Sequence, residues 1–174
     1  MDGQDILKYF ENKISAEMRL PEAIDRKLLS SFQYFGITDN IDLKDVKWVR
    51  GGYDKEQLSQ IYSDGNRSSM ERVSNIVDAL TKYVDDINNV RGIGFCVSQL
   101  HCKFMAEQFN SYGITSMYID SNSKNDERRN IKELLERGEI KFVFTVDIYN
   151  EGVDIPSINT IMFLRPTESC CQCT

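Results

Sequence analysis

The fold class of this chain is decided by the stretch Phe142-Val-Phe-Thr-Val-Asp-Ile-Tyr-Asn-Glu-Gly-Val-Asp-Ile-Pro156. Its apolar start predicts a buried strand, and the rest predicts a loop that carries a hydroxyl, a glycine and carboxylates. Gly152 lets main chain approach a ligand closely, Asp154 can accept from ribose hydroxyls, and Thr145 can donate to a phosphate. An isolated Gly-x-Asp is more often a solvated turn, but the whole string favours a ligand site.

Short apolar runs alternate with amphipathic helices on both sides of this stretch. The predicted strands are 93–97, 115–119, 141–146 and 158–164, and the predicted helices centre on 102–109 and 126–137. This alternation predicts an α/β fold, a parallel sheet with helices on both faces. Such a sheet binds ligands at the carboxyl ends of its strands, where we expect Ser98, Asp120, Asp147 and Arg165.

The first 85 residues have a different texture, mostly helical and rather polar. Pro21 suits the first turn of a helix, and apolar residues recur at helical spacing from Ser68 to Val84. Residues 32–36 predict a short strand ended by glycine, and residues 42–52 an irregular stretch around the single tryptophan, Trp48. We therefore expect a largely helical segment over 1–85 and an α/β domain over 86–174.

Composition limits the function. The chain has 174 residues and a net charge of -6, which excludes a nucleic-acid binder that depends on bulk positive charge. No apolar run approaches the ~20 residues of a membrane span. The N-terminus lacks the features of a signal peptide, which predicts a cytoplasmic protein. We expect Cys96 and Cys102 to pack as small hydrophobes, and the cysteines at 170, 171 and 173 lack the paired spacing of a metal site.

Taken together, the motifs resemble the second RecA-like domain of superfamily-two helicases. The branch is similar to helicase subunits of type I and type III restriction enzymes and to DEAD/DEAH-box helicases. Residues 95–106 resemble motif IV and its helix, residues 127–140 the helix before motif V, 145–156 motif V, and 163–169 the approach to motif VI. Residues 1–3 and 16–24 resemble the segment that follows motif III in this branch.

Two departures from the family pattern bear on activity. No Gly-Lys pair of a Walker A loop and no acidic magnesium box is present, and the sequence stops at Thr174, before motif VI. The resemblance therefore implies half of a motor, truncated before motif VI and inactive alone. ATP with Mg2+ would be used only by the full-length protein, together with the missing first RecA-like domain.

The resemblance also implies roles for individual residues. Gly152 and Asp154, with Glu151, would bind the nucleotide, although Glu151 could equally brace its loop by pairing with Arg165. Ser98 and Thr145 would contact the nucleic-acid backbone. The partner is expected to be DNA, and RNA is not excluded.

Three alternatives stay open. Arg128 and Arg129 could bind phosphate or could form surface ion pairs with Asp126 or Glu133. His101, at a helix N-terminus, could touch a phosphate, but a lone histidine is more often structural. The whole chain could instead be a non-catalytic α/β module for interaction or nucleotide sensing.

Overall fold

The computed structural model describes residues 18–39, 41–49, 51–119, 123–146 and 155–166. By its internal contacts the chain separates into two compact units, Met1–Gly36 and Ile37–Thr174. The described part of the first unit contains one helix, α1 (Leu20–Asp25), with proline in its first turn as predicted. The sheet, the remaining helices and the candidate site all belong to the second unit.

The strand predicted over residues 32–36 is wrong. These residues have neither helical nor strand structure, and the side chains of Phe32 and Tyr34 are 65% and 80% exposed. A strand needs a hydrogen-bonding neighbour, and within the described part of its own unit this stretch has only α1 beside it in the sequence. Aromatic content alone was insufficient to make a strand.

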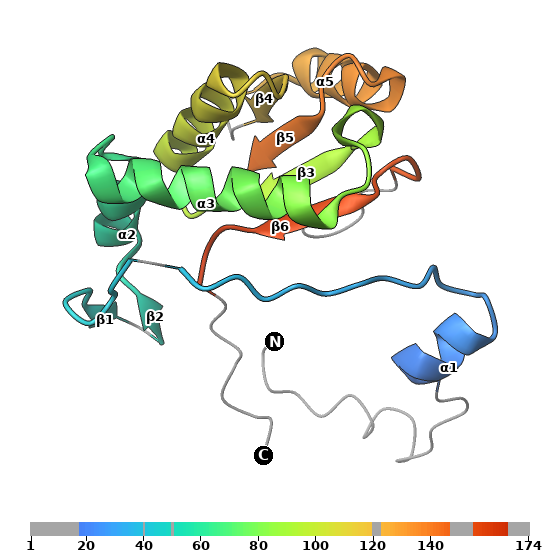
Figure 1. Ribbon diagram of the computed structural model, residues 1–174, viewed down its shortest axis with the longest axis horizontal. Coiled ribbons are helices and arrows are strands. Elements are labelled where there is room, and N and C mark those ends of the chain that lie inside the picture. The colour runs from blue at the N-terminus through green and yellow to red at the C-terminus, as the bar shows by residue number, and fades with distance from the viewer. Residues whose placement is uncertain (1–17, 40, 50, 120–122, 147–154, 167–174) are drawn as a thin grey trace. The chain divides into compact units, whose positions relative to one another are not determined.

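Four parallel strands form the sheet in the order β4-β5-β3-β6 (Figure 1). Their bounds are β3 Gly92–Phe95, β4 Ser116–Ile119, β5 Phe142–Thr145 and β6 Thr160–Phe163. Each predicted strand is therefore present, although shorter than expected. The parallel α/β class is confirmed, because all three strand pairings run in the same direction.

One face of the sheet packs against α3 (Arg67–Tyr83) and α4 (Gln99–Ser111) through aromatic rings. Phe142 and Phe144 on β5 point to this face, and Phe109 of α4 meets both rings edge-on at 5.3 and 4.9 Å between centroids. On the neighbouring strand β3, the partners in register are Gly92 and Gly94. A Cβ atom on either glycine would overlap the phenylalanine ring beside it, so the close packing requires glycine at both positions.

The opposite face is covered by α5 (Asn125–Arg137) through aliphatic side chains. Ile131 and Leu135 pack with Val143, which points away from the Phe142 face because side chains alternate along a strand. Gly138 ends the helix in the left-handed region, with φ 74°, as the sequence predicted. Figure 1 shows α3 and α5 at different sides of the strands, as expected for a sheet with helices on both faces.

Residues 42–52 are more regular than predicted. β1 (Trp48–Val49) and β2 (Gly52–Tyr53) form an antiparallel hairpin whose turn contains Gly51 at φ 88°. The hairpin leads into α2 (Lys55–Ser63), whose first turn is capped by the Asp54 carboxylate. Gly51 supplies the positive φ that the tight turn requires and Gly52 begins β2, and this glycine signal is what the sequence interpretation overlooked.

The predicted division between residues 85 and 86 falls in the connection between α3 and β3, next to the short helix η2 (Ile87–Asn89). Three residues of α3 nevertheless share a core cluster with the sheet: Val73, Val77 and Leu80. The assignment of separate roles to the two parts stays a prediction. None of the helices within the described ranges is both long and apolar enough to cross a membrane.

Candidate functional site

The carboxyl ends of β3 and β5 lie side by side and carry two of the predicted site residues. Phe95 is in register with Thr145, and the Cys96 amide donates to the Thr145 carbonyl at 2.8 Å. Ser98 follows two residues later, so Ser98 and Thr145 belong to the same edge of the sheet. Arg165, also expected at this edge, follows β6 and is half-buried. The remaining predicted residues, Asp120, Asp147, Glu151, Gly152 and Asp154, lie outside the described residues.

Ser98 is engaged in local structure. Its hydroxyl caps α4 by accepting from the His101 amide at 3.1 Å, and its Oγ also lies 2.6 Å from the Ser59 hydroxyl of α2. The side chain is half-buried. A hydroxyl can donate one hydrogen bond and accept two, so when Ser59 donates to Ser98 the Ser98 hydrogen remains available for a phosphate oxygen.

Thr145 stands in contrast, because its buried hydroxyl has no hydrogen-bond partner among the described residues. The residue is 0% exposed at the last position of β5. A buried hydroxyl without a partner costs about 1–3 kcal/mol, so such groups are rare and mark sites of ligand contact or of conformational change. The hydroxyl is therefore a candidate for a partner that arrives from outside the described chain.

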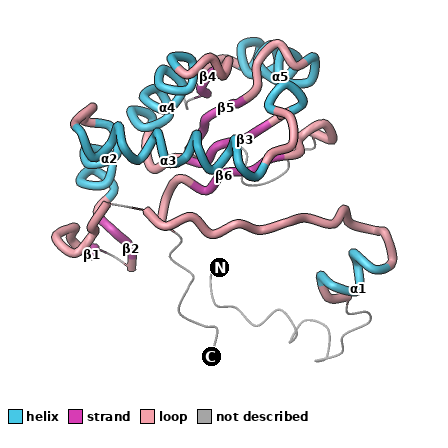
Figure 2. Tube along the Cα trace, in the orientation of Figure 1, coloured by secondary structure: helices cyan, strands magenta, loops and turns pink. Residues whose placement is uncertain are grey.

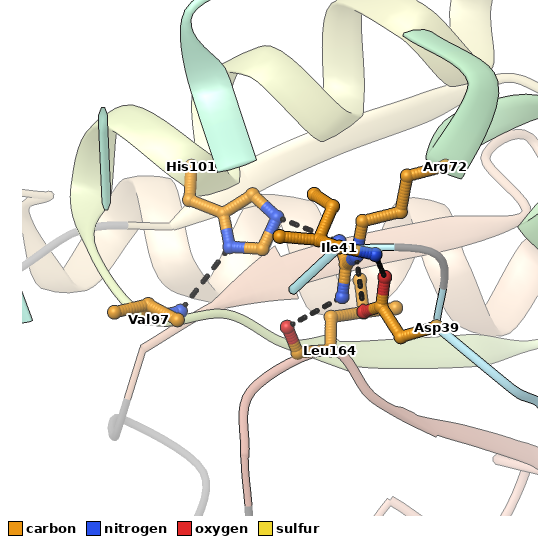
Figure 3. A network of polar contacts seen from close by, with 6 residues as sticks. All are labelled: Asp39, Ile41, Arg72, Val97, His101 and Leu164. Atoms are coloured by element: carbon orange, nitrogen blue, oxygen red, sulfur yellow. Dashed lines mark hydrogen bonds and ion pairs between the residues drawn. The ribbon is translucent and has the colours of Figure 1, made fainter. Parts of the chain in front are cut away.

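A buried arginine connects the ends of β3 and β6 (Figure 3). The Arg72 Nε donates to the Asp39 carboxylate at 2.7 Å, and its Nη2 donates to the Leu164 carbonyl at 3.0 Å. Its guanidinium also lies 4.1 Å above the ring of Tyr62. The side chain is 8% exposed, so its charge is balanced by Asp39 inside the protein and not by water.

His101 completes this network and is structural. Its Nδ1 accepts from the Val97 amide at 3.3 Å, and its Nε2 lies 3.5 Å from Arg72 Nη1. Burial first, and then the Arg72 charge, lowers the pKa of His101 to about 3. The ring is therefore neutral at physiological pH, and because a neutral imidazole has one acceptor nitrogen it accepts one of these two hydrogen bonds at a time.

The comparisons agree with the fold and with these motifs. The family model described as "Helicase conserved C-terminal domain" matches residues 71–173, which include most of α3 and all four strands of the parallel sheet. The chain belongs to this helicase family. The resemblance to the second RecA-like domain of superfamily-two helicases is thereby confirmed, and the parallel sheet of this helicase domain is RecA-like.

Several curated proteins resemble this helicase domain. IRC3 of Saccharomyces cerevisiae, named as an ATP-dependent helicase, is 28% identical over 158 residues, which are 91% of this chain and 22% of that protein. UvrABC system protein B of Chlorobium limicola is 27% identical over 175 residues, with 88% of this chain and 25% of that protein covered. The chain therefore spans about a quarter of the length of these relatives.

Among solved structures, the Hef helicase domain of Pyrococcus furiosus superposes with a TM-score of 0.46 at 17% identity. The superposition covers 66% of this chain and 30% of that one.

In this helicase domain the two arginines of α5 lie near the start of the helix. Arg129 pairs with Asp126 at 3.1 Å, and both side chains are largely exposed. This is the surface ion pair that one of the two alternatives expected. Arg128 is half-buried one turn into the helix. A phosphate contact of either arginine stays a prediction.

Neither Asp39 nor Arg72 was identified from the sequence of this helicase domain. Arg72 lies among helical residues and resembles any exposed charge, and its partner is 33 positions away in a stretch without helix or strand. One signal in the sequence could have revealed Arg72. It lies next to Val73, among the apolar residues whose helical spacing marks the buried face of α3. A charge at an apolar position of a helix indicates a buried ion pair.

No group of three or more metal-binding side chains occurs within the described ranges. Cys96 and Cys102 are both free and fully buried, as predicted, in the aromatic core. Burial raises the pKa of the Cys96 thiol, so it stays protonated and behaves as a small apolar group.

Proposed function

We propose that this chain is the second RecA-like half of an ATP-driven DNA helicase or translocase, whose ATP site is completed by a first RecA-like domain. The membership of the helicase family supports the helicase assignment. One relative is named as an ATP-dependent helicase, which supports the use of ATP. The choice of DNA rests on the resemblance to restriction-enzyme helicase subunits, and a relative named as an ATP-dependent RNA helicase keeps RNA open. The likeness to restriction-enzyme helicase subunits rests on the motifs and is part of the proposal.

The observation that carries the proposal is the buried Thr145 hydroxyl, which has no partner among the described residues and lies at the edge that also holds Ser98. In this proposal Thr145 donates to a phosphate of the nucleic-acid backbone, and Ser98 contacts a neighbouring phosphate. Thr145 is fully buried, so its contact requires the groups that cover it to rearrange first. Such a rearrangement is expected in a motor protein, in which ATP binding must change the affinity for nucleic acid.

The nucleotide would be bound on the same segment of chain. Gly152 would let main chain approach ATP, Asp154 would accept from its ribose hydroxyls, and Glu151 would support either the nucleotide or the loop. Mg2+ would be held by the acidic residues of the first domain. Arg128 and Arg129 would add phosphate contacts from the start of α5. The isolated chain would then hydrolyse no ATP, because it lacks both the phosphate-binding loop and the arginine of motif VI.

The experiment compares two variants in the full-length protein. Asp154→Ala should weaken ATP use and leave DNA binding without ATP nearly intact. Thr145→Ala should weaken DNA binding by about 1 kcal/mol, the size of one hydrogen bond to a charged group, while Thr145→Ser keeps the hydroxyl and most of the binding. DNA-stimulated ATPase and binding of a labelled oligonucleotide are the two measurements.

Two results would overturn the proposal. Stimulated ATP hydrolysis by the purified 174-residue chain alone would contradict the division of the active site between two domains. A full-length Thr145→Ala variant with unchanged DNA binding and unchanged stimulated ATPase would contradict the role of Thr145. Tighter binding of RNA than of DNA would replace DNA as the partner, and a cytoplasmic location, also part of the proposal, is tested by cell fractionation.

A further inference from the structure

Trp48, the single tryptophan of the chain, lies on the surface of the β1–β2 hairpin. Its side chain is 60% exposed, although tryptophan is one of the residues that bury most area on average. Its one ring contact among the described aromatic side chains is with Tyr53, edge to face at 5.0 Å between centroids. A large part of the indole is therefore open to a partner.

The hairpin holds this indole on a rigid support. Tyr53 packs against the cluster of Val46, Leu58, Tyr62 and Val97. Two hydrogen bonds on the Lys47 backbone fix the base of the hairpin: the Asp54 amide donates to the Lys47 carbonyl at 2.8 Å, and the Lys47 amide donates to Gln57 Oε1 at 2.9 Å. A partner that stacks on Trp48 therefore loses little free energy in ordering the protein.

The charges around the hairpin are compatible with a polyanion. Lys47 and Lys55 flank it and form no ion pair with any described residue. The Asp54 carboxylate is engaged in capping α2, while the acidic groups Asp45 and Glu56 are exposed. Basic and acidic residues balance over 42–56, so the net charge of -6 resides in the rest of the chain.

The hairpin is attached to the candidate nucleic-acid edge of the sheet. Val97, which follows β3, belongs to the same cluster as Tyr53, and Ser59 of α2 shares a hydrogen bond with Ser98. Figure 2 shows the hairpin strands next to α2. The arrow of β5 in Figure 1, drawn in the same orientation, points toward this side. A strand of nucleic acid whose phosphates pass Ser98 would thus have the hairpin close by.

We propose that Trp48 stacks on an unpaired base of a single-stranded nucleic acid held at the Ser98 edge, an inference that rests on the proposed function. An aromatic ring beside lysines is the combination that binds single strands without sequence preference, because every base has a π-face. Lys47 and Lys55 attract the phosphates, and the indole holds one base. A base inside a duplex offers no free face, so the site selects single strands.

The test uses the whole 174-residue chain at low salt and a thymidine oligonucleotide of about 16 nucleotides, the upper site size of a single-strand binding fold. Since Trp48 is the only tryptophan, its fluorescence reports this position alone. We expect quenching by the single strand, and neither by its duplex nor by an abasic oligonucleotide that keeps the phosphates. With 5-iodouracil in the strand, irradiation should cross-link the indole, and peptide mass spectrometry should find Trp48.

Variants give the size of the effect. Trp48→Ala should weaken binding of a labelled oligonucleotide about 5- to 150-fold, the range measured for aromatic–base stacking, and Trp48→Phe should lose much less. Tyr112→Ala is the matched control, because Tyr112 is also an exposed aromatic, 46%, but follows the C-terminal end of α4, the opposite end from Ser98. Circular dichroism verifies that each variant is folded.

The outcomes separate the two proposals. Binding of the labelled strand with unchanged Trp48 fluorescence and cross-links elsewhere would overturn the stacking inference and leave the proposed function standing. Equal losses in the Trp48→Ala and Tyr112→Ala variants would overturn it as well. No binding of any oligonucleotide at low salt would overturn both the inference and the nucleic-acid role of this edge. Quenching by a protein partner but not by oligonucleotides would assign the hairpin to protein docking instead.

Discussion

The carboxyl ends of β3 and β5 are neighbours in one sheet, yet they differ in how their polar groups are satisfied. Beyond β3, Ser98 caps α4 and bonds Ser59, and His101 accepts from Val97 beside the buried Arg72. At the end of β5, the Thr145 hydroxyl is buried without a partner among the described residues. Within the described residues, the polar groups named at the β3 end all have hydrogen-bond partners, whereas the Thr145 hydroxyl at the β5 end has none.

This difference predicts that substitutions at the two ends have opposite effects on the free energy of unfolding. Groups that are fully hydrogen-bonded inside the protein contribute to its free energy of unfolding and change little on function. A buried hydroxyl without a partner costs stability and can gain from a ligand. We therefore expect substitutions at the β3 end to destabilise the chain, and the loss of the Thr145 hydroxyl to stabilise it.

The largest change in stability is expected from a substitution of Arg72, which contacts His101 next to the carboxyl end of β3. Arg72→Met leaves the Leu164 carbonyl without its side-chain donor and leaves the Asp39 carboxylate with the Ile41 amide but no cation, and should lower the free energy of unfolding by about 3 kcal/mol. Urea unfolding followed by circular dichroism measures it. Arg67→Met is the matched control, because Arg67 is 91% exposed on the same helix and its surface ion pair with Glu71 should contribute very little to stability. Equal losses in the two variants would contradict the role of the network.

The next effect is a pH dependence from His101, the single histidine of the chain. Its pKa is lowered to about 3 in the folded state from 6.5, so the unfolded chain binds the additional proton between these values. Stability is then fully present above pH 6.5 and is lost as the pH falls, by about 2 kcal/mol between pH 7 and 5. His101→Gln should remove this part of the slope in urea unfolding at several pH values. The same slope in both proteins would refute the assignment.

A smaller loss is expected from Ser98→Ala, about 1–2 kcal/mol. The substitution removes the cap of α4 and leaves Ser59 without its partner. Ser111→Ala tests the other end of the same helix, where the exposed hydroxyl only donates to the Gln108 carbonyl, and should change thermal unfolding very little. Equal stability of the Ser98→Ala and Ser111→Ala variants would contradict a stabilising role of the Ser98 hydrogen bonds at the β3 end.

The smallest effect has the opposite sign. Thr145→Val keeps the shape of the side chain and replaces the unpartnered hydroxyl with a methyl group, so it should raise the free energy of unfolding by up to ~1 kcal/mol. The measurement is the midpoint of urea unfolding against the parent chain. A less stable valine variant would mean that the hydroxyl already has a partner, and the contrast between the two ends would disappear.

The elements that the sequence predicted well are those with a strong local signal. The apolar face over residues 68–84 predicted α3, and the short apolar runs between amphipathic helices predicted the parallel strands. Gly138 marks the end of α5. The strand over 32–36 failed because pairing depends on a neighbour that local composition does not reveal. The hairpin was missed because its two strands have only two residues each, too few for an alternating pattern.

The site was predictable only where it follows from strand ends. Ser98 was expected at this edge because parallel strands gather their carboxyl ends there, whereas Thr145 was selected by its hydroxyl and by the resemblance. Their contacts with nucleic acid stay predictions. The unpartnered state of Thr145 could not be predicted, because hydrogen bonding depends on atoms distant in sequence. The same holds for Arg72 and Asp39, which only the folded chain brings together.

The paired glycines and phenylalanines of β3 and β5 restrict how this sheet can vary. Because a side chain at 92 or 94 would overlap the ring at 142 or 144, neither partner can change alone without a gap or a collision. Gly94→Ala should be tolerated far better in combination with Phe144→Leu than as a single substitution. Substitutions at these paired positions of β3 and β5 should therefore occur together. Correlated changes at these positions in related sequences would then show that the two strands are neighbours.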